Sequence, residues 1–269
     1  METMDTFASH QERENSYLKK ADRLKYEDLD WLQSKPSADT DLQFLLTYFA
    51  DVEGQVFFYA RDLMNTSSAQ LQEVRNFLTI WSYQEYFHSL ALRRYLDLCQ
   101  ENNPQDRDHA LRMNITSSEK ATDITGKLFS KLASTQYLAL YLTWGSINEA
   151  MTMRGYHQIA QTTNCPLLSE LCKRIAKQES FHFGWYYTKA KEQLARSATT
   201  QKIVRYLLSK AWTPVGVGVK TRDEFKTLIS ILYRSQDERE EIVRAIDQTI
   251  HQMPGLSGLN LFASYLSAL

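Results

Sequence analysis

The chain has 269 residues, of which 43% are hydrophobic, so it is long enough to bury one large core. Its 9 glycines and 5 prolines are few, which favours a helical fold because both residues break helices. The net charge of −1 lacks the excess of basic residues that is typical of nucleic-acid-binding proteins. No apolar run approaches the roughly 20 residues that a membrane-spanning helix needs.

Cysteine usage and the polar start of the chain bear on its compartment. The three cysteines form no CxxC pair, which argues against a disulfide framework and against a zinc knuckle. Residues 1–30 are polar and charged and lack the apolar stretch of a signal peptide. We therefore expect a cytoplasmic protein with reduced cysteines.

The polar N-terminal segment, residues 1–36, precedes the first long helical pattern. Within it, "YEDLDWL" (26–32) predicts one docked turn, and Pro36 ends the segment. We expect residues 37–269 to form a single domain. Its bundle core should lie at about 39–196, with accessory helices at 197–269.

Four long helical patterns follow in chain order. They cover residues 39–65, 68–101, 131–163 and 166–196, and a short helix is expected after residue 117. Asn164 and Pro166 suit the start of the fourth pattern, since proline is favoured in the first helical turn. Shorter helices are predicted near 199–211, 221–234 and 236–252, with "PVGVGV" (214–219) as an irregular link. The pattern predicts an all-α fold.

Two of the long patterns carry the same interruption in their buried stripe. An amphipathic helix repeats its buried positions at alternating steps of three and four. Glu85 and His88 occupy two consecutive stripe positions in the second pattern, as do Glu179 and His182 in the fourth. Side chains three residues apart lie side by side on a helix, so each Glu-x-x-His can present an oxygen and a nitrogen to one metal ion.

The first and third patterns each carry one stripe glutamate, at Glu53 and Glu149. A buried ionised carboxylate must be paired, protonated or bound to metal, and few lysines and arginines lie on these faces. Four carboxylates balance two divalent cations, and two neutral imidazoles fill further ligand positions. The sequence therefore predicts a dimetal site with these ligands: Glu53, Glu85, His88, Glu149, Glu179 and His182.

The ligand types indicate the metal and the architecture. Carboxylates with imidazoles suit iron, with manganese second, whereas a structural zinc site would want thiolates. One glutamate from each of two helices, with Glu-x-x-His from each of the other two, is the pattern of ferritin-like di-iron bundles. We therefore expect a ferritin-like four-helix bundle with additional C-terminal helices and two iron ions per chain.

Four stretches extend this pattern beyond the ligands: "VEGQVFFYARDL", "IWSYQEYFHSLALRRYLDL", "NEAMTMRGYHQIA" and "LCKRIAKQESFHFGWYYTKAKEQL". Over about residues 40–196 the chain resembles the soluble acyl-acyl carrier protein desaturases, a di-iron branch of the ferritin-like superfamily. The resemblance implies an O2-dependent oxidoreductase that introduces a double bond into an acyl chain on acyl carrier protein. It also implies a ferredoxin-like electron donor and a homodimer.

The resemblance assigns one further residue and has clear departures. Thr152, one turn after Glu149, matches the hydroxyl residue that the family places near its oxygen site. The alternative is a helical threonine bonded to its own backbone carbonyl. Gln84 and Gln178 stand where relatives carry an acidic residue before each Glu-x-x-His, and Tyr156 stands in place of a histidine.

These departures leave the substrate and the reaction outcome open. A related di-iron oxygenase that hydroxylates or N-oxidises a small or carrier-bound substrate would use the same metal core. A non-catalytic ferritin-like metal-binding or iron-storage protein is the alternative of a different class. Acyl chain length and double-bond position do not follow from the sequence.

Overall fold

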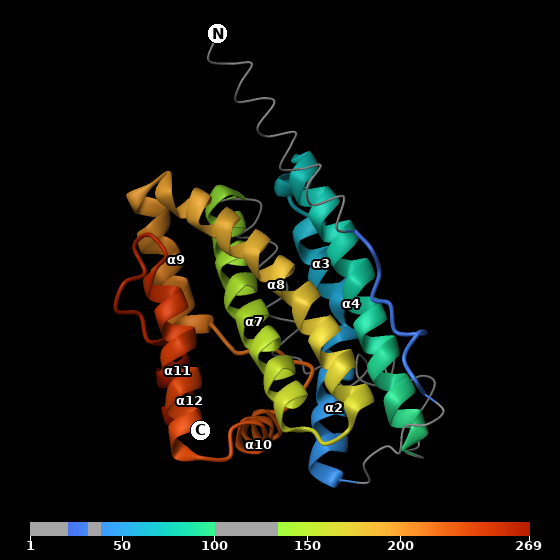
Figure 1. Cartoon of the computed structure of the whole chain (residues 1–269). Helices are drawn as coiled ribbons and strands as arrows, with labels where there is room; N and C mark the ends of the chain where they lie inside the picture. The colour runs from blue at the N-terminus through green and yellow to red at the C-terminus, as the bar shows by residue number, and fades with distance from the viewer. Residues whose placement is uncertain (1–20, 32–38, 100–133) are drawn as a thin grey trace.

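The computed structural model describes residues 21–31, 39–99 and 134–269 (Figure 1). Over these ranges all the regular elements are helical, apart from an isolated bridge between Val217 and Lys220. The helices are α2 (Thr40–Glu53), α3 (Val56–Met64), the 3-10 helix η1 (Ser67–Gln70), α4 (Gln72–Leu98), α7 (Ser134–Thr162), α8 (Pro166–Ala195), α9 (Ala198–Ala211), α10 (Arg222–Leu232), α11 (Gln236–His251) and α12 (Leu261–Ser267). The predicted all-α fold is confirmed.

Local side-chain chemistry sets most helix starts. The Asp39 side chain accepts a hydrogen bond at the start of α2, and Pro166 occupies the first turn of α8 as expected. The side chain of Ser197 caps α9. Thr221 and Ser235 form capping boxes at the starts of α10 and α11, each reciprocated by a glutamate three residues later.

The predicted single helix over 39–65 is wrong, because the chain breaks at Gly54 and Gln55. The Gln55 backbone N–H donates to the Val52 carbonyl, and the Phe58 N–H donates to the Gln55 carbonyl, each spanning three residues where an α-helix spans four. This tightened turn separates α2 from α3 directly after Glu53. One such turn barely disturbs the spacing of the apolar residues, so the sequence pattern predicted one continuous helix across it.

The other predicted boundaries agree with the structure to within a few residues. The second pattern begins as η1 and continues as α4, and the tail helices match α9, α10 and α11. The last helix, α12, was not predicted, since its seven residues are too few to show a period. The short helix expected after residue 117 lies outside the described residues.

The helices pair as two antiparallel hairpins that lie side by side (Figure 1). In one, α2 and α3 pack against α4; in the other, α7 packs along α8. Helices α4 and α7 run in the same direction. Helices α9 and α11 pack on α7, and α10 packs on α2 and α7, so the tail covers one flank of the four-helix arrangement.

The irregular link at 214–219 fastens the tail to α2. The Lys220 Nζ lies 2.5 Å from the Asp51 Oδ2, and both side chains are buried. Gly216 has φ +86°, and a Cβ there would lie 2.5 Å from the Tyr48 hydroxyl, so only glycine fits. The absence of helix over this link agrees with the sequence prediction.

Residues 21–31, here called the N-terminal strap, dock on the bundle. The predicted turn is confirmed over 26–31, where the Trp31 Nε1 donates to the Tyr26 carbonyl at 2.7 Å. On α8, Arg174 donates through Nη1 to the Lys25 carbonyl at 2.9 Å and to the Asp28 carboxylate at 2.6 Å. The strap therefore lies against the helix that carries the second Glu-x-x-His.

Candidate metal centre

All six residues predicted as metal ligands come together in the interior of the bundle. Glu53 is the last residue of α2, Glu85 and His88 lie on α4, Glu149 on α7, and Glu179 and His182 on α8. They form two overlapping groups, in each of which one ligand atom per residue lies within 4.8 Å of the others. The groups are Glu53, Glu85, His88 and Glu179, and Glu85, Glu149, Glu179 and His182.

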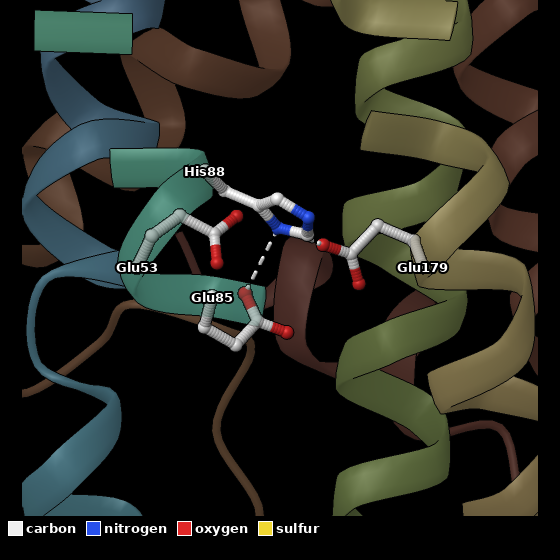
Figure 2. Close-up of side chains that lie close together, drawn as sticks. All are labelled: Glu53, Glu85, His88 and Glu179. Atoms are coloured by element: carbon white, nitrogen blue, oxygen red, sulfur yellow. Dashed lines mark hydrogen bonds and ion pairs between the residues drawn. The ribbon is translucent and has the colours of Figure 1, made fainter. Parts of the chain in front are cut away.

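The first group surrounds the imidazole of His88 (Figure 2). Its Nδ1 lies 3.1 Å from the Glu179 Oε1 and 3.3 Å from the Glu85 Oε2. Figure 2 shows the Glu53 carboxylate entering the same space from α2. His88 and Glu179 are fully buried, so bulk water does not screen these contacts.

The second group repeats this arrangement around His182. Its Nδ1 lies 2.9 Å from the Glu85 Oε1, 3.3 Å from the Glu179 Oε2 and 3.8 Å from the Glu149 Oε2. Glu85 and Glu179 therefore each direct one oxygen toward one histidine and the other oxygen toward the other. Glu85 and Glu179 could therefore be shared between two metal ions, with Glu53 and Glu149 as the further carboxylate at each end.

The electrostatics of the end carboxylates favour the neutral acid in the metal-free protein. Burial raises the pKa of Glu53 well above its ordinary value, and the charge of Glu85 raises it further. Burial likewise raises the pKa of Glu149, with the charges of Glu179 and Glu85 acting in the same direction. The raised pKa values favour a proton on each of these two carboxyls. A bound metal ion would replace that proton as the source of positive charge.

The two shared carboxylates behave in the opposite way. Burial opposes the ionisation of Glu85, but hydrogen bonds from Glu53 and the positive charge of His182 hold its pKa well below the ordinary range. Burial and the charge of Glu85 oppose the ionisation of Glu179, but hydrogen bonds from His182 and His88 lower its pKa. Glu85 and Glu179 are therefore the ionised pair.

The two histidines supply the balancing charge. Burial lowers the pKa of His88, but hydrogen bonds to Glu179 and Glu85 outweigh it and raise the pKa to about 10. The pKa of His182 is also raised, because Glu85 and Glu179 outweigh the effect of burial. With the pKa values of both histidines raised, the site favours imidazolium ions, whose charges balance those of the two carboxylates. Exchanging its four protons for two divalent cations keeps that balance, so the donor set fits a dimetal centre.

The two glutamines that depart from the family pattern contact the histidines across the bundle. The Gln178 Oε1 lies 2.8 Å from the His88 Nε2, and the Gln84 Oε1 lies 2.8 Å from the His182 Nε2. Each glutamine therefore orients the imidazole of the opposite Glu-x-x-His. The family resemblance pointed to an outer role for Gln84 and Gln178 but could not show which histidine each one contacts.

Tyr156 is a site residue whose role the sequence did not reveal. Its hydroxyl donates a 2.7 Å hydrogen bond to the Glu53 Oε1, and its ring lies 4.7 Å from that of Phe49. The sequence signal was its place on the buried stripe of α7, two turns after Glu149. Glu53 thereby has a fixed hydrogen-bond donor on one oxygen.

Thr152 makes the hydrogen bond expected of a helical threonine that is bonded to its own backbone. Its hydroxyl donates to the Asn148 carbonyl at 3.1 Å, four residues back on the same helix. The residue is buried one turn after Glu149. Its hydrogen bond is that of an ordinary helical threonine, and the predicted role near an oxygen site stays a prediction.

An apolar cavity of about 20 Å³ lies between the bundle and the tail helices. Its lining includes Phe49 and Met151 from the bundle and Leu228, Ile242 and Phe262 from the tail. A space of this size holds about one water molecule and is far too small for an acyl chain.

Comparisons with known proteins add no relative: no protein-family model matches the chain, and no curated protein or solved structure matches it. Within the described ranges, none of the helices combines the length and the apolar character that a membrane crossing requires. Cys165 and Cys172 are buried free thiols.

Proposed function

We propose that the chain is a di-iron, O2-dependent oxidoreductase built on a ferritin-like bundle. The observation that carries this proposal is the sharing of Glu85 and Glu179, each with one oxygen toward His88 and one toward His182. Two antiparallel hairpins in which α4 and α7 run in the same direction are also typical of ferritin-like bundles with such centres. Mixed oxygen and nitrogen donors suit iron, with manganese second.

The proposed reaction introduces a double bond into an acyl chain on acyl carrier protein. Two iron ions held by the six ligands would supply the redox chemistry that lets O2 take two hydrogens from an unactivated chain. O2 would also take two electrons and two protons, leaving as two waters, so a ferredoxin-like donor is required. The substrate and the donor rest on the family resemblance, as do the homodimer and the cytoplasmic location.

The protein's own side chains would prepare the site for this chemistry. Burial of the ligand groups keeps bulk water away from the reacting centre. Tyr156 binds one oxygen of Glu53 and so orients this carboxylate for metal binding. Gln84 and Gln178 hold the outer nitrogens of the two imidazoles, so that both rings face the centre through Nδ1.

A second candidate is a di-iron oxygenase that hydroxylates or N-oxidises a small substrate. The departures from the desaturase pattern at Gln84, Gln178 and Tyr156 favour it, since they change the groups that contact the same ligands. The two candidates share the metal core and differ in the product. A non-catalytic metal-binding or iron-storage protein would share the core and make no product.

Metal analysis and product mass test the proposal. Purified protein should contain about two metal ions per chain, mostly iron. Glu85→Ala and Glu179→Ala should both lower the metal content, and unchanged content would refute the assignment.

Reduced protein is then given O2, a ferredoxin system and acyl carrier proteins of varied chain length. A product lighter by two hydrogens supports desaturation, and one heavier by one oxygen supports hydroxylation. Iron oxidation without product from any carrier supports storage.

A further inference from the structure

The two glutamines beside the metal centre meet at one backbone atom outside the bundle. The Gln178 Nε2 donates to the Asp22 carbonyl at 2.8 Å, and the Gln84 Nε2 donates to the same carbonyl at 3.0 Å. Asp22 belongs to the N-terminal strap and lies 62 residues before Gln84 and 156 before Gln178. A single carbonyl oxygen from the strap therefore joins α4 to α8 above the site.

This carbonyl fixes which way each amide points. A carbonyl oxygen only accepts hydrogen bonds, so the amide NH2 of each glutamine must face Asp22. The amide oxygen of Gln178 then faces the His88 Nε2, and that of Gln84 faces the His182 Nε2. Both Nε2 atoms must carry a hydrogen, which leaves each Nδ1 lone pair for a metal.

The same geometry explains why these positions hold amides. A carboxylate at position 84 or 178 could accept from the imidazole but could not donate to the Asp22 carbonyl. Two carboxylates would also bring two further negative charges to a buried site. The glutamines keep the outer layer neutral and attach it to the strap.

The strap is held in place by contacts that do not involve the ligands. On α8, Arg174 binds the Lys25 carbonyl and the Asp28 carboxylate. On α4, the Arg94 guanidinium lies 4.4 Å from the centre of the Trp31 ring, and the Leu24 side chain is buried. These contacts fix the Asp22 carbonyl against both helices.

We propose that the N-terminal strap is a positioning element of the metal centre, acting through Gln84 and Gln178 on both histidines. The proposal rests on the proposed metal function and extends it to a part of the chain outside the bundle. Docking of residues 21–31 holds both imidazoles in the Nε2–H tautomer with Nδ1 facing the metals. Release of the strap weakens the metal site although every ligand is still present.

The test uses the full chain, labelled with 15N-histidine and loaded with Zn(II) as a diamagnetic probe. In the wild type, NMR should show hydrogen on the Nε2 of His88 and His182, with slow exchange into solvent. Gln178→Leu should speed exchange at His88 and spare His182, and Gln84→Leu should do the reverse. Each variant should bind zinc about 10–100-fold more weakly, the usual cost of removing an outer partner. The control is Gln193→Leu, which replaces a buried glutamine elsewhere on α8.

A second variant tests the strap without altering either glutamine. Arg174→Ala should speed Nε2–H exchange at both histidines and lower zinc affinity. Its control is Arg205→Ala, which removes an arginine that donates to the Gly255 and Ser257 carbonyls in the tail. Wild-type exchange rates in a folded Arg174→Ala protein and in folded glutamine variants would overturn the proposal while leaving the metal function intact. A wild-type chain that binds no zinc and no iron would overturn both.

Discussion

The two halves of the metal centre have the same donors but differ in how their end carboxylates are supported. Glu149 lies in the middle of the continuous helix α7, and its Oε2 is 3.8 Å from the His182 Nδ1. Glu53 lies at the end of α2, directly before the break, and one of its oxygens accepts from the Tyr156 hydroxyl. The halves are thus alike in ligand type but differ in the groups outside the ligand set that contact their end carboxylates.

The largest expected effect comes from the residues that the halves share. Glu85→Ala should reduce the metal content from about two ions per chain to less than one, because it removes an oxygen from both halves. Elemental analysis of protein refolded or purified with iron measures this. Retention of one fully bound ion would show that Glu85 serves a single half, against the sharing described above.

Replacing an end carboxylate should affect one half only. Glu53→Gln and Glu149→Gln should each leave about one ion per chain, because the group that does not contain the replaced residue keeps its own end glutamate and histidine. The two variants serve as controls for each other, and the metal-to-protein ratio is the measurement. Loss of both ions in either variant would contradict the independence of the ends.

Both halves should release protons when metal binds, so affinity should rise with pH. The His88 pKa of about 10 and the raised pKa values of Glu53 and Glu149 mean that these groups must lose protons first. Titration calorimetry with Zn(II) in buffers of different ionisation enthalpy, between about pH 6 and pH 9, counts the protons. Affinity that falls as pH rises would exclude the protonation states assigned to the metal-free site.

The free energy of unfolding of the metal-free chain should change with pH in the opposite direction to metal affinity, falling as pH rises. The His88 pKa is raised above its ordinary value of 6.5, so its imidazolium stabilises the fold fully below about pH 6.5. That contribution is lost as pH rises toward 10. Denaturant midpoints of the metal-free chain across this range measure it, and a midpoint that increases with pH would count against the charge assignment.

The smallest effect should come from the hydroxyl that distinguishes the halves. Tyr156→Phe removes one hydrogen bond to Glu53, which costs about 1–1.5 kcal/mol, or roughly tenfold in affinity, at one of two metals. Tyr187→Phe is the matched control, because its hydroxyl donates to Gln252 at the surface. An equal loss of affinity at both metal sites in Tyr156→Phe would show that the halves are coupled more closely than their geometry indicates.

The amino-acid sequence alone was enough to predict the all-α fold, most of the helices and the six clustered side chains. Helical periodicity records the angle of each residue about its own axis, so Glu85, His88, Glu179 and His182 were identifiable as charged or polar groups on buried stripes. Their residue types, together with the burial cost of a carboxylate, pointed to metal. The break after Glu53 was missed because one tightened turn leaves the period almost unchanged.

Tertiary structure decided the relations between helices, about which periodicity says nothing. The packing of α4 against α8 brings the two Glu-x-x-His motifs together into one cluster with shared carboxylates. It also places Gln84 of α4 against His182 of α8, and Gln178 of α8 against His88 of α4. The Asp22 carbonyl was beyond prediction, because every residue has a carbonyl and only folding selects the one that two amides can reach. Side-chain chemistry is encoded locally, whereas the choice of partner is made by the packing of distant segments.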